Sequence, residues 1–372
     1  MISSGGHGWR IGTLSGIPVF LGRSWILVAL VMVFIFGPIV NNIMPDFRVG
    51  AYAIATLFAV LLLLSVLVHE AAHAIVAQRV GFTVSRIVAD FWGGHTAHDG
   101  AGGTPGRSAA VAVVGPLANG VLALLGWWAT GWFEPGVAWL LAYAFTFANA
   151  FVAIFNLLPA LPLDGGFLLE ALVWRVSGNR YLGTMVAGWF GRLLVVLLGI
   201  WAISPMLIDG EDVSLLRIVW VILIGAFLWQ GASQAVDAGR LGVRLSRRQV
   251  SEVARPVGVI PADAALDGVD WRSRELWIVL GADGRPEGVV DPRALSSVPH
   301  QAWSGTTANA LAVRLPEGWA ATLDESTRLD RVLEIMRSTG SGVVGLLDDS
   351  GRPWGAVLVD DVSASGGIGP RS

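Results

Sequence analysis

Two histidines and a glutamate lie close together within one apolar stretch of the chain. His69 and His73 are four residues apart, Glu70 follows the first of them, and seven of the eight residues before them are apolar. A spacing of four residues places both imidazoles on one face of a helix, one turn apart, so they can grip a single zinc ion. Glu70 is adjacent and can take a proton from an attacking water.

An alternative is that these polar groups serve only helix packing. An ionisable side chain at mid-bilayer costs roughly 2.5–3.5 kcal/mol on insertion scales. Here three such side chains occur within five residues. A bound dication offsets this cost, whereas ordinary packing does not, so the sequence favours a metal site.

A catalytic zinc site usually has three protein ligands. The chain contains no cysteine, so the third ligand must be His, Asp or Glu. The best candidate is Asp164, which follows two prolines and precedes two glycines in the run from Asn156 to Gly166. Such a break after a helix can aim a carboxylate back into a bundle. An Asp–Gly pair is, however, equally typical of a turn in which the aspartate caps the next helix.

The composition indicates a membrane protein. Hydrophobic residues make up 54% of the 372 residues and charged residues 14%, with a mean hydropathy of +0.63. A soluble domain carries roughly 25% charged residues. The net charge of -3 argues against nucleic acid as a partner. No cleavable signal peptide is expected, because the first apolar run is too long for one.

Six segments are expected to cross a bilayer, which takes about 20 mostly apolar residues. They lie at about 17–40, 51–77, 109–132, 136–158, 182–208 and 215–235. With six spans, the arginine-rich loops all fall on one side, so both termini are expected in the cytoplasm. β-Branched residues from Phe82 to Val88, followed by glycines, predict a small β element between the second and third spans.

The last third of the chain is less apolar and is predicted to be a soluble domain. We expect a membrane domain at 1–248, a regulatory domain at 249–363 and a disordered tail at 364–372. Residues 275–290 and 342–358 each predict a hairpin with a glycine-containing turn, and an amphipathic helix at 326–336 precedes the second. The two units resemble a tandem pair of cystathionine-β-synthase (CBS) domains, which are α/β domains.

The resemblance to nucleotide-binding CBS copies is incomplete. Such a copy typically has Ser or Thr three residues after the turn glycine and Asp three residues later. Leu358 and Asp361 stand at these positions in the second unit, and Asp291 and Ala294 in the first. Nucleotide binding is therefore left open, with a dimerising or substrate-sensing role as the alternative.

The two chemical motifs together resemble the site-2 proteases, peptidase family M50, a family of intramembrane zinc metalloproteases. His-Glu-x-x-His in one apolar span is paired with Asn-x-x-Pro-x-x-Pro-Leu-Asp-Gly after a later one. The resemblance covers about residues 17–240 and is greatest to the bacterial members with a C-terminal CBS pair. It implies one zinc per chain, with His69, His73 and Asp164 as ligands and Glu70 as catalytic acid and base.

The resemblance also implies substrate contacts. The run from Gly115 to Asn119 is similar to the family's Gly-x-x-x-Asn element, which suggests that Asn119 binds substrate backbone or oxyanion. An interhelical hydrogen bond is an equally weighted alternative. Gly94 and His95 would lie on a strand beside the cleft, able to pair with an unwound substrate. A metal role for His95 together with His98 is less favoured.

The expected protein is thus a polytopic α-helical membrane protein with a C-terminal CBS pair, located in the plasma membrane. Its expected function is regulated intramembrane proteolysis of membrane proteins such as single-span regulators. One alternative is a non-proteolytic zinc membrane protein, which does not explain the motif around Asp164. Another is a metal transporter, which needs ligands at several depths of the bilayer, whereas the sequence shows one cluster. The tail could also hold a homodimer together.

Overall fold

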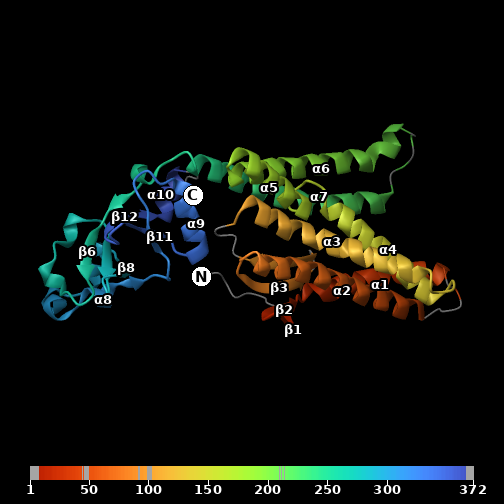
Figure 1. Ribbon diagram of the computed structural model, residues 1–372, viewed down its shortest axis with the longest axis horizontal. Helices are drawn as coiled ribbons and strands as arrows, with labels where there is room; N and C mark the ends of the chain where they lie inside the picture. Colours follow the sequence, from red (N-terminus) through yellow and green to blue (C-terminus); the bar gives the residue numbers. More distant parts are fainter. Residues whose placement is uncertain are drawn as a thin grey trace. The chain divides into compact units, whose positions relative to one another are not determined.

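The computed structural model (Figure 1) describes residues 8–43, 45, 50–90, 93–98, 103–208, 210, 212 and 214–365. The chain divides into two compact units, one ending at Gly239 and the other beginning at Arg240. Within the described residues, six helices are long and apolar enough to cross a membrane, as predicted. These are α1 (Ser24–Ile43), α2 (Gly50–Arg79), α3 (Pro105–Thr130), α4 (Val137–Asn156), α6 (Arg180–Ile208) and α7 (Leu215–Leu245).

The first span begins at Ser24, so the prediction that it starts near Ile17 was wrong. Residues Ile17–Leu21 form strand β2 instead. This strand pairs antiparallel with β1 (Trp9–Leu14) and parallel with β3 (Val84–Asp90). Hydropathy alone does not separate a short apolar strand from the first turns of an apolar helix.

A tight turn and a small core explain why this segment becomes a strand. Ser15 and Gly16 both have positive φ and reverse the chain between β1 and β2. Ile17 then packs with Ala74 of α2 and Ile87 of β3. The sheet and α2 hold this strand in place. The first membrane-spanning helix therefore begins at Ser24, seven residues after Ile17.

The β element predicted between the second and third spans is part of this larger sheet. Strand β4 (Gly93–His98) pairs antiparallel with β3, and the strand order is β1-β2-β3-β4. Both β3 and β4 pack against α2. The sheet therefore lies beside the helix that carries the His-Glu-x-x-His motif.

A short helix, α5 (Asp164–Ser177), connects α4 and α6 without being long enough to span a bilayer. Two glycines at its start allow the chain to fold back on itself. A Cβ atom on Gly165 would lie 2.3 Å from the carbonyl oxygens of Leu157 and Leu158, and one on Gly166 would lie 2.3 Å from the nitrogen of Leu161. The glycines after Asp164 thus permit the sharp return that brings α5 against α3.

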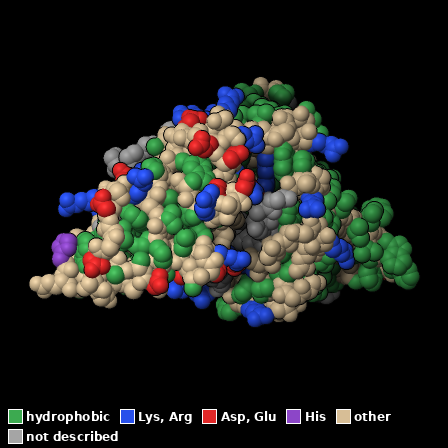
Figure 2. Space-filling model, turned by 60° about the vertical axis from the view of Figure 1, so that its left-hand side comes forward, with side chains coloured by type: hydrophobic (Ala, Val, Ile, Leu, Met, Phe, Trp, Pro, Cys, Tyr) green, Lys and Arg blue, Asp and Glu red, His purple; other side chains and the backbone are tan. Residues whose placement is uncertain are grey.

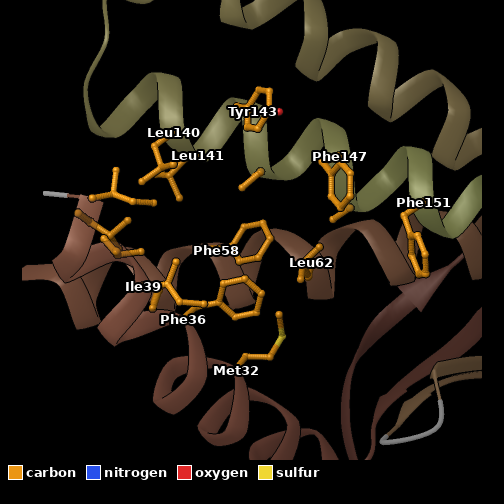
Figure 3. A pocket seen from close by; sticks show the side chains of 16 residues that line it. Met32, Phe36, Ile39, Phe58, Leu62, Leu140, Leu141, Tyr143, Phe147 and Phe151 are labelled. Carbon is orange, nitrogen blue, oxygen red and sulfur yellow. The ribbon is translucent and has the colours of Figure 1, made fainter. Parts of the chain in front are cut away.

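An apolar cavity of about 420 Å³ opens between α1, α2 and α4 (Figure 3). Side chains from all three helices point into it, among them Phe36, Phe58, Leu62 and Phe147. Helix α2 lines this cavity with one part of its length and carries His69 and the other motif residues further along.

The C-terminal unit contains two four-stranded sheets with the same topology. In each, a parallel pair is followed by two antiparallel pairs, so the predicted duplication is confirmed. The first sheet comprises β6 (Gly258–Pro261), β7 (Trp277–Leu280), β8 (Pro286–Val290) and β9 (Val313–Arg314). The second comprises β10 (Ala320–Thr322), β11 (Val343–Leu347), β12 (Pro353–Leu358) and β5 (Arg255–Pro256).

Three α-helices lie wholly within the described part of this unit: α8 (Ala308–Leu311), α9 (Leu329–Thr339) and α10 (Val359–Ser365). Helix α9 is the predicted amphipathic helix, and its buried face includes Leu329 and Val332. On the face shown in Figure 2, acidic and basic side chains are interspersed among apolar ones. Of the tail predicted to be disordered, residues 364 and 365 belong to α10, and residues 366–372 lie outside the described part.

Candidate metal centre

Helix α2 places three functional side chains in the interior of the first unit. His69, Glu70 and His73 are all buried, and each offers a ligand atom within 4.8 Å of the others. The two imidazole rings meet edge to face with centroids 4.7 Å apart, and their Nε2 atoms are 3.0 Å apart. The spacing of one helical turn therefore brings both rings to the same point, as expected from the sequence.

Asp164, the first residue of α5, joins the two imidazoles. Its Oδ2 atom is 3.1 Å from Nε2 of His69 and 3.4 Å from Nε2 of His73. The N-cap of α5 is Leu163, so Asp164 does not occupy the capping position of this helix. The structure thus directs this carboxylate into the bundle and not to the helix that it begins.

The donor set fits a bound cation. His73 donates from Nδ1 to the carbonyl of Val111 (2.6 Å), and Nδ1 of His69 faces Oδ1 of Asn119, which can only accept. In the neutral rings both Nε2 atoms are then acceptors that face Asp164. Oδ2 of Asp164 is buried, and no described residue donates a hydrogen bond to it.

The spacing of these three acceptor atoms is close to that of zinc ligands. Ligand atoms at about 2.0–2.2 Å from a tetrahedral zinc would lie about 3.3–3.6 Å apart. The separations here are 3.0, 3.1 and 3.4 Å, so one lies in this range and two are slightly shorter. Three lone-pair-bearing atoms packed this closely in a buried site need a positive charge among them.

Gly115 of α3 leaves the room that such an ion requires. A Cβ atom at this position would lie 2.2 Å from Nε2 of His73 and 2.6 Å from Nε2 of His69. Only a glycine allows the α3 backbone to approach the imidazoles this closely. Gly115 is part of the quoted Gly-x-x-x-Asn element, but the sequence analysis gave it no role of its own.

Asn119 lies behind His69, with its side chain committed to neighbouring groups. Its Oδ1 bonds Nδ1 of His69, and its Nδ2 donates to Oγ of Ser65 (3.0 Å) and to Oδ1 of Asn149 (2.8 Å). The expected contact of Asn119 with substrate stays a prediction, and it would require exchange of one of these bonds.

Ser65 and Asn149 were not predicted from the sequence. Ser65 stands four residues before His69, so the same one-turn spacing could have placed it on the ligand face. Asn149 is a single polar residue within an apolar span and gave no sign of its partner.

The other predicted substrate residues, Gly94 and His95, lie on β4, where they pair with Ala89 and Val88 of β3. The side chain of His95, like that of His98, lies outside the described part of the structure. Their backbone position beside α2 agrees with the expected strand, and their contact with substrate remains a prediction.

Known proteins share sequence similarity with this chain. A model of peptidase family M50 matches residues 133–198, the segment that contains Asp164. Two relatives named as zinc metalloproteases, sll0528 of Synechocystis and Rip3 of Mycobacterium tuberculosis, are each 29% identical to the chain. The alignment with sll0528 covers 81% of both chains, and that with Rip3 covers 82% of this chain and 79% of the relative.

Two solved structures show similarity to parts of the chain. A site-2 protease from Methanocaldococcus jannaschii is 24% identical over 62% of this chain and 95% of its own, with a TM-score of 0.44. The CBS domain of a bacterial CNNM/CorC family Mg2+ transporter is 17% identical over 34% of this chain and 93% of its own, with a TM-score of 0.27. From the family match around Asp164 and the two relatives that span most of its length, we conclude that the chain resembles the zinc metalloproteases of peptidase family M50.

Proposed function

We propose that this protein is an intramembrane zinc endopeptidase that cleaves membrane-spanning proteins, among them single-span regulators. The observation that carries the proposal is the meeting of His69, His73 and Asp164 beside Glu70 within a bundle of helices that can span a membrane. Among the described residues there is one cluster of this kind, which supports hydrolysis over metal transport, because transport needs ligands along the whole path.

Each residue of the cluster has a distinct role in this proposal. His69, His73 and Asp164 would hold the ion through Nε2, Nε2 and Oδ2. Zinc, when bound, supplies Lewis acidity that makes water nucleophilic near neutral pH. Glu70 accepts a proton from the attacking water and passes it to the nitrogen of the leaving amine. Its burial separates this proton transfer from bulk solvent.

Strand β4 is the proposed docking edge for the substrate. A peptide bond in a helix is shielded by the hydrogen bonds of its own backbone, so the substrate must unwind before cleavage. An unwound segment could then add to β4, which ends the strand order and has β3 as its strand neighbour in the described sheet. Gly94 and His95 lie on this strand, which packs against the motif helix α2.

We also propose a plasma-membrane location with both termini in the cytoplasm, on the basis of the arginine-rich loops. CBS domains in the tail would regulate cleavage or hold a homodimer together. Nucleotide binding there has to compete with an existing contact. Asp361, at the expected polar position, accepts two hydrogen bonds from Arg255, at 3.0 and 2.7 Å.

The decisive variant is Glu70→Gln. The amide keeps the shape of the side chain but cannot take the proton, and general acid–base catalysis contributes roughly 10²- to 10⁴-fold. We expect cleavage of a single-span test protein in vesicles to fall by at least about 100-fold while zinc content stays near one per chain. The control is Glu134→Gln, which changes an exposed carboxylate between α3 and α4. Full cleavage by zinc-loaded Glu70→Gln would refute the role of Glu70.

The role of the tail is tested by removing it. A chain that ends after Arg248 should differ from the intact protein in cleavage rate or substrate choice, since the regulatory CBS units are gone. Cleavage of the same test protein would be measured for both chains, with and without ATP or AMP. Equal rates and equal substrate choice under all these conditions would show that the tail is not a regulator.

A further inference from the structure

A row of buried polar side chains lies behind the imidazole of His69. Ser65, Asn119 and Asn149 come from three different helices, α2, α3 and α4, and are 5%, 1% and 1% exposed. They are bonded to one another and, through Asn119, to Nδ1 of His69. Polar groups buried this deeply in an apolar bundle must satisfy each other, so the direction of each bond is constrained.

A backbone carbonyl determines which groups in this row donate and which accept. Asn149 donates from Nδ2 to the carbonyl oxygen of Phe145 at 2.9 Å, and a carbonyl can only accept. The amide group of Asn149 must therefore point there, which leaves its Oδ1 facing Asn119. Asn119 in turn must present its NH2 group to that oxygen, so its own Oδ1 faces His69.

The end of the row determines where the proton of His69 sits. The oxygen of Asn119 cannot donate, so Nδ1 of His69 carries the hydrogen and Nε2 keeps its lone pair. That lone pair points to the same place as Nε2 of His73 and Oδ2 of Asp164. A flipped amide at position 119 would place donor against donor at Nδ1 and would favour the other tautomer.

We infer that Asn149 and Asn119 are positioning residues that fix the Nδ1–H tautomer of His69 and thereby raise the affinity of the site for zinc. The side chain of Asn149 hydrogen-bonds Ser65, Asn119 and the carbonyl of Phe145, and it acts on His69 through Asn119. The inference rests on the zinc site of the proposed function but not on proteolysis. Groups that orient a ligand imidazole in this way typically contribute 10- to 100-fold to metal affinity.

The first test uses the unaltered protein. The intact chain, labelled with ¹⁵N-histidine and freed of zinc, would be examined by NMR at pH 8.5, with the His69 signals assigned by their loss in His69→Gln. We expect a hydrogen on Nδ1 and none on Nε2. A ring that carries its hydrogen on Nε2 overturns the inference, whether or not any variant folds.

The second test separates positioning from simple helix packing. In Asn149→Ala and Asn119→Leu, zinc affinity measured by competition with a fluorescent chelator should fall about 10- to 100-fold. The matched control is Thr184→Val, which removes the interhelical hydrogen bond from Thr184 to Glu170 (3.0 Å) away from the ligands. It should change zinc affinity less than about twofold.

Thermal unfolding of the zinc-free proteins would be measured in parallel. If Asn149→Ala and Thr184→Val lower the unfolding temperature alike and neither changes zinc affinity, the row only packs helices and the inference fails. Loss of zinc affinity in Asn149→Ala but not in Thr184→Val supports the inference. This holds even if the protein proves inactive on every substrate tried.

Discussion

The two units of this protein are packed in opposite ways. In the helical unit the buried apolar residues are mostly alanines, while large side chains such as Phe34 and Leu124 are 79% and 69% exposed. In the C-terminal unit the cores consist of large residues such as Leu329 and Ile278, both fully buried. Lipid solvates large apolar side chains, so helices in a bilayer associate through small residues and polar contacts.

The same contrast holds for polar groups. The polar residues buried within the helices that can span a membrane gather around one place, and they are Ser65, His69, Glu70, His73, Asn119 and Asn149. Polar side chains of the C-terminal unit are mostly exposed. In the helices that can span a membrane, buried polar side chains therefore mark the functional site, whereas in the C-terminal unit polar side chains mark the surface.

We expect the largest loss of stability when a large side chain is removed from the core of the C-terminal unit. Leu329→Ala should destabilise that unit by about 2–5 kcal/mol, because it leaves a cavity among tightly packed neighbours. Phe34→Ala removes a larger side chain from the outer face of α1 and should cost far less. Hydrogen exchange of each unit in the intact, detergent-solubilised protein measures both. Equal destabilisation by the two variants would contradict the comparison.

We expect the next largest effect, a loss of zinc affinity, when a methyl group is added at a glycine of the helical unit. Gly115→Ala places a Cβ atom 2.2 Å from Nε2 of His73. Overpacking costs about 1–3 kcal/mol, and here the imidazoles must give way, so zinc affinity should fall roughly 10- to 100-fold. Gly120→Ala on the same helix meets no atom within 4 Å and is the control. If Gly115→Ala binds zinc as tightly as the unaltered protein in the chelator competition, the site does not need the close approach of α3 to the imidazoles.

The smallest effect is expected at the surface of the C-terminal unit. Arg248 pairs with Glu252 four residues later, and their side chains are 49% and 45% exposed. Exposed ion pairs contribute about 0–1 kcal/mol. Arg248→Met should therefore change the stability of this unit, again followed by hydrogen exchange, by less than about 1 kcal/mol. A loss near that of Leu329→Ala would show that polar contacts also hold this unit together.

Much of the architecture follows from local sequence patterns. The spans, the amphipathic helix beginning at Leu329 and the paired hairpins all come from periodicity and turn residues. The first span was misplaced because Ile17–Leu21 is as apolar as the helix that follows it. Its pairing with β3, more than sixty residues away, cannot be inferred from local hydropathy.

The site was predictable where its residues are close in sequence. His69, Glu70 and His73 share one helix, so their spacing defines their geometry. Asp164 could be named only as a candidate, since its distance from the imidazoles depends on how α5 folds back against α3. Asn149 could not be predicted, because its side-chain partners Ser65 and Asn119 lie on two other helices.

The hydrogen-bond partners of the two imidazoles differ in how easily a substitution can remove them. The partner of His73 is the main-chain oxygen of Val111, which every residue type at that position supplies. The partner of His69 is encoded by the side chains at positions 119 and 149. A random mutant library selected for altered metal affinity should therefore yield substitutions at 119 and 149 and tolerate apolar exchanges at 111. The orientation of His73 depends on a backbone atom that substitutions leave in place, whereas that of His69 depends on two particular side chains.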